Sequence, residues 1–236
     1  MKLIELTDYS LRPLGNGQGI YRFDFSLSEG DVCYINAGDD VGQLFLRALA
    51  TFETPLQGVY RYRGEVLDFS DYRHLLPIKR RIGYISSDVA LISNRTLLDN
   101  LLLSKTYFEN TLSKELPDDM AELCRHFQLV DKLRLRPAQV SQGDRRIAAV
   151  IRELGKKPEV LLLERPRDFM GFRIFELFQE ILTDIIHGGT PVVFQAADEE
   201  FVWEVANREI RIAGGKLESL PFMTGNFNNK TPVTKR

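Results

Sequence analysis

Apolar residues along this chain follow two spacings, one typical of β-strands and one typical of α-helices. Residues 3–27 alternate apolar and polar positions around glycines, which predicts a pair of antiparallel strands. The apolar run Val32–Ile35 predicts a buried strand, and the pattern from Leu44 to Leu49 predicts a helix after it. Residues 89–154 are mostly helical in pattern, and residues 173–187 carry one apolar stripe, which predicts a core-facing helix between two parallel strands. This order of strands and helices indicates an α/β protein.

The turn after Val32–Ile35 has the setting of a phosphate-binding loop without its chemistry. In a loop of the form G-x-x-x-x-G-K-[ST], the lysine neutralises phosphate charge and the hydroxyl holds Mg²⁺. At that spacing this chain has an uncharged glutamine and then a leucine, and two aspartates add negative charge where a phosphate would lie. By itself, the segment is better explained as an ordinary strand, turn and helix. The residues concerned are Ala37, Gly38, Asp39, Asp40, Gly42, Gln43 and Leu44.

Five segments further along the chain share an order and spacing that resemble the nucleotide-binding subunit of ATP-binding cassette (ABC) transporters. None is specific alone, and the resemblance rests on their succession as far as about Leu220. They are similar to the strand entering the Q-loop, the signature motif, the Walker B strand, the switch-histidine strand and the closing hairpin. In this chain they occupy residues 82–87, 140–146, 158–166, 190–198 and 208–218.

The resemblance implies an α/β, ABC-type P-loop NTPase fold. It has a parallel central sheet, an N-terminal antiparallel β subdomain and an inserted helical subdomain that carries the signature. The implied domain spans residues 1–220, with its core in 1–88 and 155–220 and the helical subdomain in 89–154. Residues 221–236 are rich in Asn, Thr, Lys, Gly and Pro, which predicts a flexible tail.

Measured against the family pattern, this chain departs at each position that handles metal, water or the γ-phosphate. The Q-loop glutamine falls on Ser87, and the Walker B carboxylate falls on Glu164, a longer acid that still offers oxygens to a metal. The general-base position holds Arg165, which cannot accept a proton, and the switch-histidine position holds Ala197. We therefore expect a pseudo-ATPase with no catalytic residue, for which ATP and Mg²⁺ are only weak candidate ligands.

The signature-like residues Ser141, Gln142, Gly143 and Asp144 are closer to the family pattern. In the family, a signature faces the phosphate loop of the opposite chain, so this segment implies a second, intact ABC ATPase as a heterodimer partner. A homodimer is also possible, although it would pair two incomplete sites. The serine keeps a hydroxyl and Gly143 permits close backbone approach, whereas Gln142 replaces a glycine and crowds it.

The leading hypothesis is a structural or regulatory subunit of a membrane permease, located in the cytoplasm at the inner face of the membrane. It would dock through a groove beside Ser87 to Leu103, which the apolar run Leu97, Leu98, Leu101 and Leu102 would line. The first alternative is a stand-alone pseudo-ATPase scaffold or regulatory module. The second is a divergent but active ABC ATPase in which Arg165 or Gln43 contacts phosphate.

Composition excludes several other classes. A net charge of −2 over 236 residues argues against a nucleic-acid partner, and Lys79–Arg81 is interpreted as a solvated basic face. No apolar stretch is long enough to span a membrane, and the apolar run at the start is too short for a signal peptide. The three histidines are isolated from one another, so neither a histidine metal site nor a histidine-based triad is expected.

Overall fold

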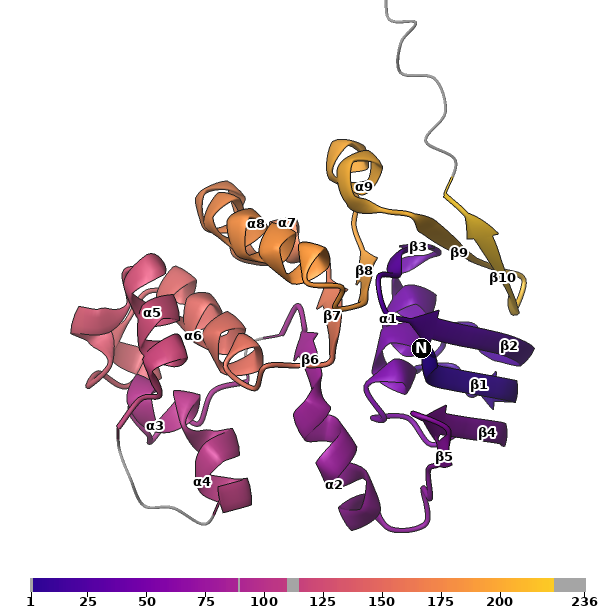
Figure 1. The fold of residues 1–236 in the computed structure, drawn as a ribbon, viewed down its shortest axis with the longest axis horizontal. Helices are drawn as coiled ribbons and strands as arrows, with labels where there is room; N and C mark the ends of the chain where they lie inside the picture. The colour runs from indigo at the N-terminus through magenta and orange to yellow at the C-terminus, as the bar shows by residue number, and fades with distance from the viewer. Residues whose placement is uncertain (1, 89, 110–114, 223–236) are drawn as a thin grey trace, which may run out of the picture.

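Two β-sheets with helices between and around them organise the chain (Figure 1). The structure is a computed structural model that describes residues 2–88, 90–109 and 115–222. Within that range the chain has the α/β architecture expected from its pattern, with one antiparallel sheet and one mostly parallel sheet.

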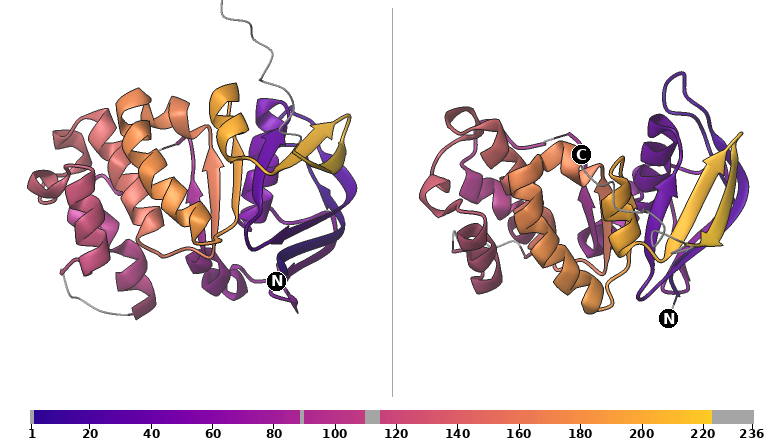
Figure 2. Two further views of the ribbon diagram at one scale, coloured as in Figure 1. Left: turned by 45° about the horizontal axis from the view of Figure 1, so that its top comes forward. Right: turned by 90° about the horizontal axis from the view of Figure 1, so that it is seen from above.

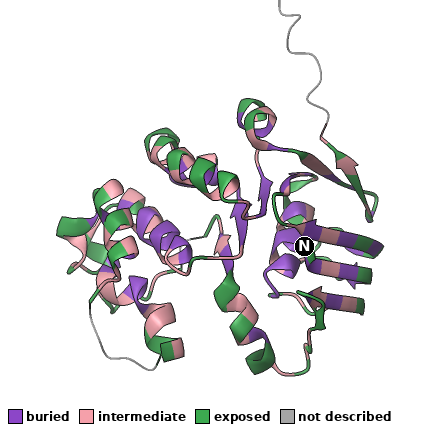
Figure 3. Ribbon diagram, in the orientation of Figure 1, coloured by how far each residue is buried: buried purple, intermediate pink, exposed green. Residues whose placement is uncertain are grey.

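The central sheet has six strands, and five of them run parallel. Strand β10 is the antiparallel edge, so the sheet is mixed rather than wholly parallel. Strands β7 and β8 lie in the interior and are buried along their whole length, as Figure 3 shows. In spatial order the strands are β10 (Lys216–Pro221), β9 (Arg208–Ala213), β3 (Val32–Asn36), β8 (Val192–Gln195), β7 (Val160–Glu164) and β6 (Ile82–Ile85).

The N-terminal sheet is antiparallel throughout, which confirms the strand pair expected for residues 3–27. Helix α1 (Asp39–Leu49) lies between this sheet and the central one and contacts both. Phe45 of α1 packs edge-on against Phe23 and Phe25, which ties the two sheets into one apolar core. The strands follow the order β2 (Ile20–Ser28), β1 (Lys2–Leu11), β4 (Gln57–Tyr62) and β5 (Glu65–Val66).

Helices on the other side of the central sheet form a second apolar core with it (Figure 2). Helix α8 (Phe172–His187) confirms the core-facing helix expected between two parallel strands, β7 and β8. The expected helical region contains α3 (Leu97–Leu101), α4 (Leu103–Glu109), α5 (Asp118–His126), α6 (Gln142–Leu154) and two single 3₁₀ turns (Val130–Lys132, Pro137–Gln139). Helices α7 (Pro166–Met170) and α9 (Glu199–Val205) complete this layer.

Helix α2 (Tyr72–Arg81) has no strong signal in the sequence. It contains Pro77 and buries only Leu75, so it lacks the apolar stripe that marks the other helices. The side chain of Asp71 accepts a hydrogen bond from the Arg73 N–H and begins the helix. Figure 3 shows most of α2 exposed or half-exposed.

The C-terminal boundary differs slightly from the expectation of a tail that begins at residue 221. Strand β10 continues to Pro221, and the Phe222 ring packs 5.1 Å from Trp203 between ring centroids. Residues 223–236 of the expected tail lie outside the described part of the chain.

Candidate functional site

At the phosphate-loop position the helix begins early, within the spacing that a phosphate loop would occupy. Strand β3 ends at Asn36, only Ala37 and Gly38 follow, and α1 begins at Asp39. The Gly42 N–H donates to the Gly38 carbonyl at 2.9 Å, as in an ordinary helical turn. A phosphate cradle needs backbone N–H groups that point into the loop, and here this N–H is used inside the helix.

The N-terminus of α1 is already occupied by the chain's own charges. Asp39 and Asp40 lie in its first turn, where carboxylates stabilise the helix dipole. The Arg165 guanidinium forms an ion pair with Asp39, and the Gln195 amide donates to the same carboxylate at 3.4 Å. The Arg165 guanidinium and the Gln195 amide are therefore both bound to the Asp39 side chain of the helix.

The remaining residues at this position are explained by packing. Leu44 is buried in the core and faces away from the loop. A Cβ atom on Gly42 would come within 2.7 Å of the buried Gln195 side chain, whereas one on Gly38 would meet nothing within 4 Å. The small residue at position 42 thus makes room for Gln195, a residue that the sequence pattern did not single out.

Glu164, at the end of β7, is a buried carboxylate with four hydrogen-bond donors. Its Oε1 accepts from the Gln43 amide at 2.6 Å. Its Oε2 accepts from the Tyr84 hydroxyl at 3.1 Å, the Ser86 hydroxyl at 3.2 Å and the Ser87 N–H at 3.1 Å. Burial and the neighbouring carboxylate raise the pKa of Tyr84, so its hydroxyl remains a donor. The expected Q-loop, Walker B and phosphate-loop positions therefore do meet, around this one carboxylate.

These residues do not fit a Mg²⁺ ion with its nucleotide. Four donors already bind Glu164, three at Oε2 and one at Oε1, so a metal ion would have to displace a donor or approach through the remaining lone pair of Oε1 alone. Leu44 adds no oxygen, and the described residues contain no group of three acidic, histidine or cysteine side chains that could hold a metal. Arg165, the next residue in the chain, is already paired with Asp39.

The turn after β7 and the switch position complete this edge of the sheet. Arg165 has φ 44°, a left-handed conformation that is uncommon for a non-glycine residue, and its N–H donates to the Gln195 carbonyl at 2.9 Å. Ala197 is exposed and presents only a methyl group. The next residue, Asp198, is the N-cap of α9, and its side chain accepts a hydrogen bond from the Phe201 N–H. Asp198 also forms an ion pair with Arg167.

The signature-like segment forms the N-terminus of α6. The Ser141 hydroxyl accepts from the Asp144 N–H and donates to the Asp144 carboxylate, which is a capping box. Gln142 is exposed, and a side chain on Gly143 would meet only ordinary contacts. Gln142 lines a hollow of about 400 Å³ together with Ser87, so the signature-like segment lies near one end of the Glu164 cluster, although none of the four donors to Glu164 comes from it.

Asp144 should stabilise the chain in a pH-dependent way. Burial acts to raise its pKa, but hydrogen bonds from Lys132 and Ser141 outweigh burial and hold the pKa below its ordinary value. A depressed pKa means that the ionised form stabilises the fold above the ordinary aspartate pKa, and that this stabilisation is lost as the pH falls through the folded-state pKa. We expect Asp144→Ala to lower the free energy of unfolding by about 2 kcal/mol at neutral pH.

The measurement is urea unfolding of parent and variant at neutral pH and near pH 3. The difference should shrink at the lower pH, because the parent then loses the same interaction. Asp118→Ala is the control, since Asp118 begins α5 without a side-chain cap bond. A difference that stays constant between the two pH values would contradict the ionic role of Asp144.

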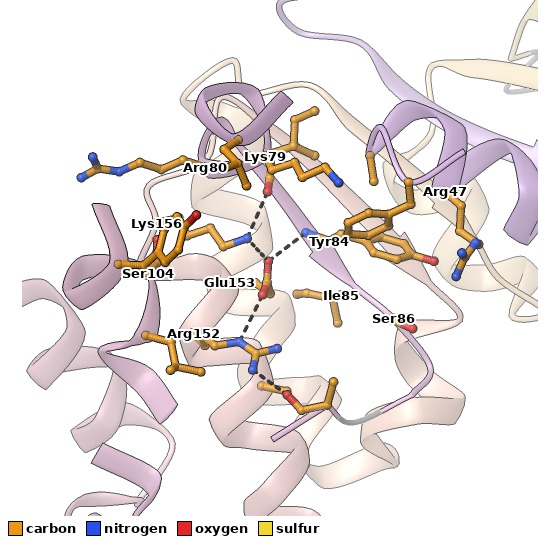
Figure 4. A pocket seen from close by; sticks show the side chains of 18 of the residues that line it. Arg47, Lys79, Arg80, Tyr84, Ile85, Ser86, Ser104, Arg152, Glu153 and Lys156 are labelled. Atoms are coloured by element: carbon orange, nitrogen blue, oxygen red, sulfur yellow. Dashed lines mark hydrogen bonds and ion pairs between the residues drawn. The ribbon is translucent and has the colours of Figure 1, made fainter. Parts of the chain in front are cut away.

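A groove of about 620 Å³ lies between α2 and β6 on one side and α4 and α6 on the other (Figure 4). Glu153 lies at its floor, where it accepts from Lys156 at 2.5 Å, Arg152 at 3.3 Å and the Tyr84 N–H at 3.2 Å. Phe52 and Tyr107 at its rim are 46% and 64% exposed. The groove thus combines apolar rim side chains with a polar, firmly bonded floor.

Lys79 is a charged residue of this groove that lies against an aromatic ring. Its ammonium lies 4.8 Å from the centre of the Phe52 ring, and burial lowers its pKa. It has no ion-pair partner among the residues that the structure describes, whereas Arg47 and Arg80 pair with Glu53 and Glu109. Of the expected solvated basic face, Arg80 and Arg81 are exposed, whereas Lys79 is half-buried against the Phe52 ring.

The apolar residues expected to line this groove are in the core instead. Leu97, Leu101 and Leu102 are buried at 3% exposure or less, because α3 packs against α6, and Leu98 is half-buried but does not line the groove. The groove is lined by the next helix, α4, through Leu103, Ser104, Tyr107 and Phe108. A single apolar spacing does not distinguish a core face from a groove face.

Comparison with known proteins agrees with this fold and order of motifs. A family model described as ABC transporter matches residues 42–167, which is more than half of the chain. The chain therefore belongs to the ABC transporter family.

The most similar curated proteins include importer ATP-binding proteins. The L-cystine import ATP-binding protein TcyC of Bacillus subtilis is 24% identical over 210 residues, which cover 87% of this chain and 85% of that protein. The spermidine/putrescine import ATP-binding protein PotA of Pseudomonas fluorescens is 27% identical, but the match spans 73% of this chain and only 46% of PotA.

Solved structures share the fold. The ATP-binding subunit of an ABC transporter superposes with a TM-score of 0.77 at 15% identity, covering 93% of this chain and 90% of that one. A dimeric ATP-binding cassette in a post-hydrolysis state with ADP and Pi superposes with a TM-score of 0.76 at 19% identity, covering 95% and 100%. Among the described helices of this chain, none is long and apolar enough to cross a membrane.

Proposed function

We propose that this chain is a non-hydrolytic subunit of an ABC transporter, a pseudo-ATPase that acts through protein contacts. One observation carries the proposal: the side chains at the phosphate and metal positions bind one another. Gln43 is bonded to Glu164, and Arg165 is paired with Asp39. A nucleotide and its metal would have to break both contacts before making any of their own.

Catalytic chemistry is missing at the same positions. Arg165 cannot accept a proton from water, and the methyl group of Ala197 cannot stabilise a developing phosphate charge. A general base alone contributes about 10²- to 10⁴-fold to a rate. The proposal is tested by phosphate release from Mg-ATP, which should not exceed the rate without protein.

A second, intact ABC ATPase chain is the proposed partner across the nucleotide interface. Ser141 and Gln142 are exposed at the start of α6, so this segment is free to face another chain. A structure of similar fold is described as a dimer, which supports this pairing. In a homodimer, the phosphate-loop position of each chain, at residues 37–44, would face the signature-like segment of the other chain at the start of α6.

The proposed partner at the groove is a helix of a membrane permease, which places the chain at the inner face of the membrane. The import proteins to which the chain is similar support a permease partner. The groove suits one amphipathic helix with an acidic side chain, because Phe52 and Tyr107 offer apolar contacts and Lys79 offers an unpaired cation. The proposed domain organisation remains one domain over residues 1–220, with the helical subdomain in 89–154.

Replacing Tyr107 by aspartate should weaken this docking. The change puts a charge on an exposed apolar contact of the rim, and we expect the membrane-bound fraction to fall by about fivefold. The measurement is co-purification with the cognate permease from solubilised membranes. Tyr72→Asp is the matched control, since Tyr72 is 67% exposed and lies outside the groove. Equal recovery of Tyr107→Asp and parent would contradict docking at this groove.

A further inference from the structure

A second cavity, of about 730 Å³, lies at the opposite side of the molecule from the groove. It is formed between α9 and residues of β3, β9 and β10, and Figure 1 shows α9 beside the start of β9. Its volume is in the range of cavities that bind small molecules in proteins. It is lined by Tyr34 and Asn36 of β3, Ala196 and Ala197 after β8, Glu199, Val202 and Trp203 of α9, Glu209 and Arg211 of β9, and Leu220, Pro221 and Phe222.

Three aromatic side chains meet at this cavity. The Phe222 ring lies 5.1 Å from Trp203 and 6.4 Å from Tyr34, between ring centroids. All three are partly exposed, so their ring faces are accessible from the cavity. Aromatic rings attract cations through the negative charge of their faces. The apolar part of the cavity therefore favours a positively charged ligand over a negative one.

The charged side chains of the cavity also favour a positively charged ligand. Glu209 accepts from Asn36 at 2.7 Å and pairs with Arg211 at 3.1 Å, so its charge is largely compensated. Glu199 has no ion-pair partner in the part of the chain that the structure describes, which leaves one uncompensated carboxylate. Burial, then Glu209 and Glu199, raise the pKa of Tyr34, which places the field of both carboxylates at the tyrosine hydroxyl.

We propose that this cavity binds a small organic cation through an ammonium or guanidinium group. The cation would pair with Glu199 while its carbon atoms contact the aromatic side chains. An anion would be repelled by Glu199, and a neutral apolar molecule would leave that carboxylate without a counter-charge. The cavity shares no lining residue with the groove or with residues 37–44, and although Ala197 lines it, binding of a cation there does not depend on the proposed pseudo-ATPase role.

The chain offers a direct probe of this cavity, because Trp203 is its single tryptophan. The experiment titrates the purified full chain with Nα-acetyl-arginine ethyl ester, whose single charge is the guanidinium, and follows tryptophan fluorescence. Nα-acetyl-citrulline ethyl ester is the matched control, since it replaces the guanidinium by a neutral urea group of nearly the same shape and carries no charge. We expect a saturable change with the arginine ester at millimolar concentration or below, and none with the citrulline ester.

Variants locate the site. Glu199→Gln should weaken binding of the arginine ester by about fivefold or more, whereas Glu200→Gln should leave it unchanged, because Glu200 is exposed beside it and does not line the cavity. Thermal unfolding confirms that both variants remain folded. Equal responses to the two esters, equal effects of the two variants, or no saturable change would each overturn the proposal.

A further arm distinguishes a free molecule from a side chain of a partner protein. The peptide acetyl-Gly-Arg-Gly-amide presents the same guanidinium within a chain. Binding of the ester at least as tight as that of the peptide supports a free small cation. Binding of the peptide alone would overturn the proposal in favour of a protein ligand.

Discussion

Replacing Glu164 by alanine is expected to lower the free energy of unfolding by about 3 kcal/mol, and the midpoint of thermal unfolding by about 6–12 °C. The carboxylate is buried and accepts from Gln43 of α1, Tyr84 and Ser86 of the β6 segment, and the Ser87 N–H. Removing it leaves these donors without their acceptor, and each unsatisfied buried donor costs about 1–3 kcal/mol before the structure relaxes. The measurement is denaturant unfolding of parent and variant.

A carboxylate kept for metal binding would behave differently. Without its metal it would be an uncompensated buried charge, and its removal would be neutral or stabilising. The control is Glu218→Ala, since Glu218 is exposed on β10 and should change stability by less than about 0.5 kcal/mol. If Glu164→Ala were as mild as this control, the structural role assigned to Glu164 would be wrong.

The second large effect is expected when the charge at the phosphate position is reversed. The triple variant Asp39→Asn, Asp40→Asn and Gln43→Lys removes two negative charges, adds one positive charge and releases Arg165 from its ion pair. A like-charge contact near a protein surface costs up to about 4 kcal/mol at roughly 4 Å. We therefore expect ATP to bind this variant at least about tenfold more tightly than the parent, a gain of about 1.4 kcal/mol.

Calorimetric titration with ATP measures this gain. Asp118→Asn with Asp119→Asn is the control for charge, because these two acids occupy the first turn of α5, far along the chain from the phosphate position. The control should bind ATP no better than the parent. Tight ATP binding by the parent, or no gain in the triple variant, would show that charge does not limit binding at this position.

The fold was predictable because its strands and helices carry strong local patterns. Helix α8 extends over residues 172–187, within one residue of the expected 173–187, since its apolar stripe is regular. Helix α2 was missed because Pro77 interrupts it and only Leu75 is buried. The groove-lining residues were assigned wrongly because Leu97 and Leu101 show the same spacing in a core helix as they would at a groove.

The candidate site was only partly predictable. The positions of Ser87, Gln43 and Glu164 were chosen by resemblance to the family, and the structure brings all three together. Their hydrogen bonds join residues 77 and 121 positions apart, and no local pattern in the sequence reports such contacts. Gln195 was missed for the same reason. A glutamine at the end of a buried apolar strand, two residues before the switch position Ala197, was the only signal for it.

Phosphate release from Mg-ATP by the purified chain tests the central claim most directly. The account predicts a rate equal to that of buffer without protein, for the parent and for the variants Gln43→Ala and Arg165→Ala. A parent rate above that background, lost in either variant, would contradict the account, because it would mean that Gln43 or Arg165 contacts the nucleotide and that the chain is an active ATPase.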